Sequence, residues 1–170
     1  FMTAYGALKN AGELRRGESV AIVGTGGVGS ALIPLARHLG ASRIVAVDVR
    51  DDKLAAARAL GATETVNASK ADPVAAAGGG VDVAIEALGL PQTVEQAFQM
   101  TRDGGRTVIV GVAAPKVSAP IEILRLVRRG IRLTGSYGCR VRTDMPELLK
   151  LAAAGAVDLR AAVSRRYRLA

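Results

Sequence analysis

Residues 20–29 read VAIVGTGGVG, and this stretch decides the fold. Four apolar residues suited to a buried strand lead into a turn rich in glycine. Gly24 permits a tight turn out of the strand, Gly26 lets the backbone approach a bound group closely, and Gly29 lets the next helix pack on the sheet. Gly27 and Val28 complete the turn, and the N-terminal N–H groups of the helix that follows it are predicted to face a phosphate.

A second strand follows the helix, because residues 44–47 read IVAV and end on Asp48. A carboxylate at this place in the pattern accepts hydrogen bonds from the hydroxyls of an adenosine ribose. Strand, glycine turn, helix, strand and acid together predict a dinucleotide-binding unit. Asp48 would repel a 2′-phosphate and apolar Val49 can lie against adenine, so NAD is favoured over NADP. Arg50 and Lys53 weaken this choice, since a cation near the ribose also attracts phosphate.

The rest of the chain alternates strand and helix, which implies a doubly wound α/β fold of the Rossmann type. Its six parallel strands are expected in the order 3-2-1-4-5-6. The whole chain, residues 1–170, is interpreted as one dinucleotide-binding domain. Further strands are expected at residues 65–67, 81–86, 106–110 and 131–136, and helices at residues 2–14, 52–60, 71–77, 91–100, 121–129 and 145–154.

Prolines and acids set expectations for the helices. Pro34 lies inside the helix that follows the glycine turn and removes a hydrogen bond to Ser30, so a bend or local irregularity is expected there. Asp51 or Asp52 is expected to cap the next helix. Pro146 is expected in the tolerated first turn of the last helix.

In an open sheet of this order, ligands bind at the carboxyl ends of the strands where the order reverses, between the first and fourth strands. The crevice is expected to be lined by the glycine turn and by two strand-to-loop segments, Ala87-Leu88-Gly89 and Val110-Gly111-Val112. Ordinary strand-to-loop turns are the alternative interpretation of the last two segments.

Composition limits the other classes of function. The chain has 170 residues, 49% of them apolar, which suits a single domain with a sizeable core. No segment is predicted to span a membrane or to act as a signal peptide, so a cytoplasmic protein without membrane partners is expected. Cys139 and His38 are the only residues of their types, so no metal site and no catalytic residue is predicted in this chain.

The net charge of +8 is concentrated in the C-terminal third. Residues 121–170 hold 11 Lys and Arg against 4 Asp and Glu, whereas residues 1–120 hold 12 against 11. This basic region lacks interleaved aromatic residues and any known nucleic-acid-binding module, so nucleic acid is not an expected partner. A solvated surface, attraction for an anionic cofactor and contact with acidic groups of a larger protein remain as explanations.

The chain resembles the coenzyme-binding domain of the medium-chain, zinc-type alcohol dehydrogenases over essentially its whole length. Such enzymes transfer hydride reversibly between an alcohol and a nicotinamide. The matching segments are TAYGAL at residues 3–8, GESV at 17–20, GTGGVG at 24–29, IVAVD at 44–48, LGA at 60–62, GGR at 104–106, VIVG at 108–111 and LAAAG at 151–155.

The resemblance implies roles for individual residues. Val28 would press against the nicotinamide, Lys53 would reach the adenosine ribose, Val110 would offer its backbone to the carboxamide, and Thr3 would lie near the nicotinamide ring. Each also has a purely structural alternative. Val28 would be a core residue of its helix and Val110 a core residue of its strand. Lys53 would be a surface charge and Thr3 a helix cap. The edge strand at residues 131–137 would pair with a second copy in a dimer, and a protected monomeric edge is the alternative.

The resemblance also implies a catalytic domain that this chain lacks. We expect the catalytic zinc and the alcohol or carbonyl site to belong to that domain, with residues 1–16 as a lead-in helix, 17–160 as the core and 161–170 returning toward it. On this interpretation the chain is an excised coenzyme domain, inactive alone. The alternatives are a stand-alone NAD-binding or interaction module and an NADPH-dependent branch related to quinone reductases, which Asp48 disfavours.

Two unrelated enzyme classes share parts of the pattern. Tyr5 and Lys9 form the YxxxK motif of short-chain dehydrogenases, but they precede the glycine turn, whereas that class needs them far downstream. A methyltransferase would also use a glycine-rich first turn and an acid after the second strand. The family resemblance, which extends through the later strands, disfavours the methyltransferase.

Overall fold

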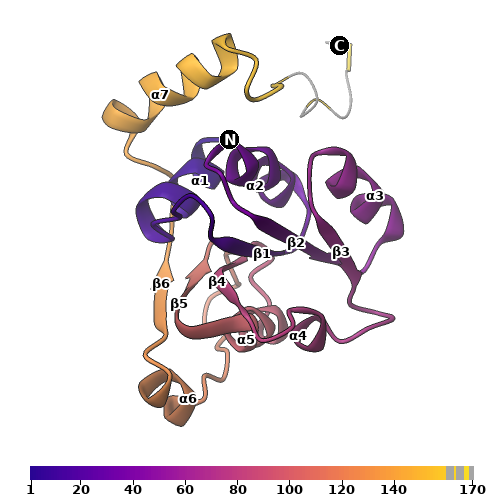
Figure 1. The fold of residues 1–170 in the computed structure, drawn as a ribbon, viewed down its shortest axis with the longest axis vertical. Helices are drawn as coiled ribbons and strands as arrows, with labels where there is room; N and C mark the ends of the chain where they lie inside the picture. The colour runs from indigo at the N-terminus through magenta and orange to yellow at the C-terminus, as the bar shows by residue number, and fades with distance from the viewer. Residues whose placement is uncertain (160–162, 164–166, 169–170) are drawn as a thin grey trace.

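The computed structural model describes residues 1–159, 163, 167 and 168. Six parallel strands form one sheet in the order β3-β2-β1-β4-β5-β6, which confirms the predicted topology (Figure 1). Most of residues 161–170, which are expected to return toward another domain, lie outside the described residues. The strands are β1 (Ser19–Val23), β2 (Arg43–Asp48), β3 (Glu64–Asn67), β4 (Val81–Glu86), β5 (Thr101–Ile109) and β6 (Arg132–Gly135).

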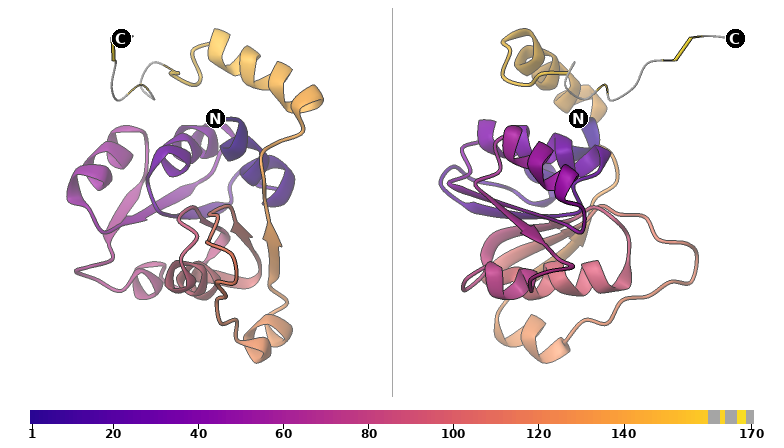
Figure 2. Two further views of the ribbon diagram at one scale, coloured as in Figure 1. Left: turned by 180° about the vertical axis from the view of Figure 1, so that it is seen from behind. Right: turned by 90° about the vertical axis from the view of Figure 1, so that its right-hand side faces the viewer.

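Helices cover both faces of the sheet, as the views from behind and from the side show (Figure 2). Within the described residues, no helix is both long enough and apolar enough to cross a membrane. One face carries α1 (Met2–Tyr5), η1 (Gly6–Ala11), α2 (Gly27–His38) and α3 (Asp51–Ala59), and α7 (Val141–Ala153) lies outside α1. The other face carries α4 (Pro73–Ala76) and α5 (Pro91–Met100). α6 (Ile123–Arg128) lies beyond α5.

Alternate residues of each central strand enter two separate cores. In β1, Val20 and Ile22 pack in the core beneath α2, whereas Ala21 and Val23 pack in the core beneath α5. Because helices cover both faces, these strands are buried on both sides and carry continuous apolar runs. The pairing of β1 with β2 and with β4 in this helix-covered sheet places the carboxyl ends of the three strands side by side.

The first helix is shorter and less regular than predicted. It becomes a π-helix at Gly6 and ends at Ala11, and Gly12 N donates to Ala7 O at 2.8 Å. The residue after Gly12, Glu13, has a φ of 46° and turns the chain. The prediction of one helix to residue 14 is therefore wrong. The π-helix holds one more residue in its hydrogen-bonded turn than an α-helix does, and the positive φ of Glu13 ends the helical path.

The local irregularity expected at Pro34 is not seen, because α2 remains α-helical through this residue, and the expected cap of α3 is corrected. Asp51 and Asp52 lie in the first turn of α3 and do not cap it, because Asp51 pairs with Lys70 and Asp52 with Arg50.

The last helix starts earlier than predicted. α7 begins at Val141, so Pro146 lies in its interior and not in its first turn. The cause is Asp144, whose carboxylate accepts hydrogen bonds from Arg140 N at 2.7 Å and from Asn10 Nδ2 at 2.7 Å. The strand predicted at 106–110 also starts earlier, at Thr101, and smaller boundary shifts affect the helices predicted at 71–77 and 121–129.

Asp82 makes part of the stability of the sheet depend on pH. Its carboxylate accepts hydrogen bonds from Ser19 N and Oγ at 2.8 and 2.6 Å and pairs with Arg102 at 2.6 Å. Burial alone would raise the pKa of Asp82, but these partners lower it from 3.8 to about 2. The stabilisation is therefore present above about pH 4 and is lost as the pH falls toward 2, by about 2 kcal/mol.

We expect Asp82→Asn to lower the free energy of unfolding at pH 7 and to flatten its decline between pH 4 and pH 2. Urea unfolding at a series of pH values measures both effects. Asp103→Asn is the matched control, because this carboxyl near the start of β5 also pairs with an arginine, Arg129, but is largely exposed. If the free energy of unfolding declines equally steeply between pH 4 and pH 2 in Asp82→Asn and in the unaltered chain, this role of Asp82 is contradicted.

Candidate functional site

The glycine turn joins β1 to α2 as predicted. Gly24 adopts a φ of 93°, and its N–H donates to Val47 O at 2.8 Å, which ties the turn to β2. Gly26 and Gly27 are exposed, and a Cβ at either position would meet nothing within 4 Å. A Cβ on Gly29 would lie 1.9 Å from Gly24 O. Gly29 therefore permits close packing, while Gly26 and Gly27 leave the start of α2 open to a ligand.

Asp48 is held at the end of β2 by four hydrogen bonds. Oδ2 accepts from Thr25 N at 2.9 Å and from Thr25 Oγ1 at 2.8 Å. Oδ1 accepts from Val49 N at 2.8 Å and from Arg50 N at 3.2 Å. Burial opposes ionisation, but these hydrogen bonds outweigh it and lower the pKa of Asp48. The site therefore presents a fixed negative charge beside the glycine turn.

Thr25 was not predicted as a site residue, although it occupies the variable position of the glycine motif. Its side chain is buried, and its hydroxyl and amide supply two of the four donors to Asp48. A carboxylate has about four acceptor positions. A ribose hydroxyl that binds Asp48 must therefore share or replace one of the existing hydrogen bonds.

A cavity of about 240 Å³ opens between the ends of β1 and β2 and the start of α5. It brings together four predicted site residues that lie far apart in the sequence, and large exposed apolar side chains form much of its wall. Its apolar walls suit a ring held beside a carboxylate. The lining residues are Val23, Gly24, Val47, Asp48, Val49, Ala68, Leu88, Leu90, Gln92, Thr93 and Gln96.

Three more predicted residues follow β4 and β5 at the same end of the sheet. Ala87 N donates to Val23 O at 2.9 Å, and Val110 N donates to Glu86 O at 2.9 Å. The two loops touch, since a Cβ on Gly111 would lie 1.9 Å from Gly89 N. These contacts bring Ala87, Val110 and Gly111 to the predicted crevice, outside the wall of the 240 Å³ cavity.

The remaining predicted residues do not line that cavity. Val28 is half-buried and packs against the core beneath α2. Thr3 is half-buried on α1, and Lys53 is exposed on α3. Their implied contacts with a nucleotide therefore stay predictions.

Glu86 is a buried carboxylate that the sequence interpretation assigned only to a strand. Its Oε1 accepts hydrogen bonds from Leu88 N, Gly89 N and Thr93 Oγ1 at 2.7 to 2.8 Å. Its Oε2 is buried and has no hydrogen-bond partner among the described residues. Glu86 therefore fixes the loop after β4 to the start of α5, which positions two walls of the crevice. A charged residue at the end of an otherwise apolar strand was the available signal.

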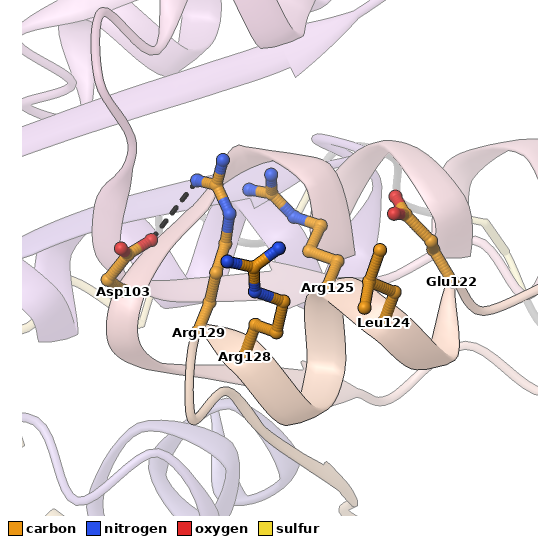
Figure 3. Close-up of a pocket in the computed structure, with 6 residues that line it drawn as sticks. All are labelled: Asp103, Glu122, Leu124, Arg125, Arg128 and Arg129. Atoms are coloured by element: carbon orange, nitrogen blue, oxygen red, sulfur yellow. Dashed lines mark hydrogen bonds and ion pairs between the residues drawn. The ribbon is translucent and has the colours of Figure 1, made fainter.

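A larger cavity, of about 390 Å³, lies away from the crevice beside α6 (Figure 3). Asp103, Glu122, Arg125, Arg128 and Arg129 line it together with one leucine. Arg129 Nη1 lies 3.1 Å from Asp103 Oδ1, and Arg125 Nη2 donates to backbone carbonyls. Part of the basic C-terminal third is thus used in local ion pairs and hydrogen bonds.

The described residues contain no group of three or more His, Cys, Asp or Glu side chains that could hold a metal ion. Cys139 is a free, half-buried thiol. His38 lies in the last turn of α2, as predicted. The part of the chain that the structure describes therefore does not fit a catalytic zinc.

The sheet order and the glycine turn define a doubly wound domain of the Rossmann class. A family model described as zinc-binding dehydrogenase matches residues 27–154. The chain belongs to this family, which confirms the resemblance found in the sequence. An alcohol dehydrogenase from Geobacillus stearothermophilus is 41% identical over 159 residues, which are 92% of this chain and 45% of that protein.

Solved structures agree with this assignment. The crystal structure of benzyl alcohol dehydrogenase from Acinetobacter calcoaceticus matches with a TM-score of 0.89 and 31% identity, over 92% of this chain and 45% of that one. A protein described as a zinc-binding dehydrogenase from Sinorhizobium meliloti 1021, bound to NADP, matches with a TM-score of 0.87 and 32% identity, over 94% and 48%. The chain thus spans about half the length of the relatives that it matches.

Proposed function

We propose that this chain binds a nicotinamide dinucleotide, NAD(H) in preference to NADP(H), as the coenzyme domain of a zinc-type medium-chain alcohol dehydrogenase. Asp48 carries the proposal, because a hydrogen-bonded carboxylate with a lowered pKa stands beside the glycine turn and the 240 Å³ cavity. Such a charge favours a ribose hydroxyl and repels a 2′-phosphate. The Sinorhizobium neighbour holds NADP, so the choice of NAD depends on the residues of this chain.

In this proposal the adenosine occupies the cavity at Asp48 and Val49, and the pyrophosphate lies at the exposed glycines of the turn. The nicotinamide end lies toward Val28 and the loops that carry Ala87, Val110 and Gly111. Thr3 and Lys53 complete the set, near the nicotinamide and the adenosine ribose respectively. The residues of this chain bind and orient the nucleotide, and the bound nicotinamide supplies hydride chemistry.

The whole enzyme would transfer hydride reversibly between an alcohol or carbonyl substrate and the nicotinamide. Because the described residues do not fit a zinc ion, we assign the catalytic zinc and the substrate site to residues beyond these 170. The chain is then expected to bind nucleotide without turnover. A cytoplasmic location is part of the proposal and is compatible with a free cysteine.

We also propose self-association through the edge of the sheet at residues 131–137. Within the described part of the chain, β6 pairs with β5 alone. Leu133 and Tyr137 beside this edge are exposed, and α6 next to it buries none of its residues. An unpaired edge with exposed apolar side chains is a template for pairing with a second copy. Sedimentation of the chain at several concentrations tests this association.

Nucleotide choice is tested by replacing Asp48. We expect Asp48→Ala to weaken NADH binding by about tenfold and to narrow the difference in affinity between NADH and NADPH, because the charge and its ribose hydrogen bonds are lost. Calorimetric titration with each nucleotide measures both effects. Asp103→Ala, far from the crevice, is the control that should leave both affinities unchanged. Equal affinities in Asp48→Ala and the unaltered chain would remove Asp48 from the proposal.

A further inference from the structure

Two amide side chains stand out among the polar groups of the 240 Å³ cavity. Gln92 and Gln96 lie one turn apart on α5 and both line the cavity. In the described part of the chain, neither amide has a hydrogen bond to another residue, whereas Asp48 accepts four and Thr93 Oγ1 contacts both Glu86 Oε1 and Leu90 O. Gln92 and Gln96 are therefore the polar side chains of this wall that a ligand could bind without displacing a hydrogen bond of the described chain.

Gln96 is the more informative of the two. Gln92 is exposed to solvent, but Gln96 is half-buried in a wall that includes exposed Val49, Leu88 and Leu90. Apolar side chains exposed around a cavity favour a flat ring, and a partly buried amide without a partner favours a ligand that forms hydrogen bonds. The environment of Gln96 thus combines an apolar surface for a ring with a polar group for its edge.

We propose that the Gln96 amide reads the edge of the adenine base and makes this site selective for adenine among purines. The inference rests on the proposed function, since it concerns the same dinucleotide. A carboxamide presents an NH2 donor group and a carbonyl acceptor side by side in one plane. Adenine presents a matching pair, the N6 amino donor and the N7 acceptor, and glutamine binds this pair with two hydrogen bonds.

Hypoxanthine is the sharpest comparison, because it differs from adenine at this edge by one group. The N6 amino donor becomes a carbonyl oxygen, so the edge presents two acceptors. The amide then keeps one hydrogen bond and brings its own oxygen against an acceptor. One unmatched contact in a partly exposed site predicts a preference for adenine of about five- to tenfold, the lower end of the range for base reading.

The test compares NADH with its hypoxanthine analogue, reduced nicotinamide hypoxanthine dinucleotide, by calorimetric titration of the full chain. We expect the unaltered chain to bind NADH about five- to tenfold more tightly. Gln96→Leu should bring this ratio close to one, mainly by weakening NADH binding. Gln96→Met is a second variant of similar volume that guards against misfolding of the first, and circular dichroism verifies both folds.

Gln99→Leu is the matched control on the same helix. Gln99 donates to Glu95 at 3.2 Å and does not line the cavity, so its replacement should keep the ratio. A ratio near one in the unaltered chain, or an unchanged ratio in folded Gln96→Leu and Gln96→Met, would overturn the role of Gln96 while NADH binding still upholds the proposed function. Absence of binding by both nucleotides to the unaltered chain would overturn both proposals.

Discussion

Replacing Gly29 with alanine should lower the free energy of unfolding by about 3 kcal/mol and should abolish nucleotide binding. A Cβ at this position would lie 1.9 Å from Gly24 O and 2.9 Å from Gly24 C, and neither backbone atom can rotate away. Gly24 is itself held by its hydrogen bond to Val47 O. The clash between the added Cβ and Gly24 is therefore removed only if the buried helix α2 or the turn moves, and such a movement is costly in a close-packed core.

Gly27→Ala provides a control two residues away in the same turn. A Cβ there would meet nothing within 4 Å, and Gly27 is the first residue of α2. Urea unfolding should place this variant within about 0.5 kcal/mol of the unaltered chain, because a glycine-to-alanine change at a compatible position mainly restricts the unfolded state. Equal stabilities of Gly29→Ala and Gly27→Ala would show that the close approach of Gly29 to Gly24 does not limit the turn.

The contrast between these glycines illustrates what a sequence can predict. The order of the sheet followed from the buried apolar runs and the glycine turn, because local pattern and topology rules specify both. The sequence predicts close packing at Gly29, and the contact of its Cβ position with Gly24 O confirms it. The approach of Gly26 to a pyrophosphate stays a prediction. Asp48 lies at the end of β2, as predicted, because a charged residue that follows an apolar run marks the end of a strand.

The partners of these residues were not predictable, because they depend on contacts between distant parts of the chain. Asp144 starts α7 early through a hydrogen bond to Asn10, 134 residues away. Gln96 enters the cavity because α5 packs on β1 and β4, so that its first turns lie near the end of β2. The hydroxyl of Thr25 reaches Asp48 only when β1 and β2 are paired. Local propensity carries no information on such contacts.

The ion pair between Arg106 and Glu18 should have the second large effect. Arg106 Nη2 lies 2.6 Å from Glu18 Oε1, and their side chains are only 6% and 17% exposed. The pair joins β5 to the residue that precedes β1. Glu18→Ala would leave a buried guanidinium whose Nε already lacks a hydrogen-bond partner among the described residues. We expect a loss of about 3 kcal/mol in the free energy of unfolding, because a buried charge without its partner is strongly destabilising.

Glu13→Ala is the matched control, because Glu13 pairs with Arg132 at 3.1 Å with both side chains about half exposed. Such surface pairs contribute at most about 1 kcal/mol, and high salt screens them. The double variant Glu18→Leu with Arg106→Met separates charge from packing. It should recover much of the stability lost in Glu18→Ala, since a buried ion pair can be exchanged for apolar residues at little cost. If Glu18→Ala and Glu13→Ala lose equal stability in urea unfolding, the buried charge is not what makes Glu18 important.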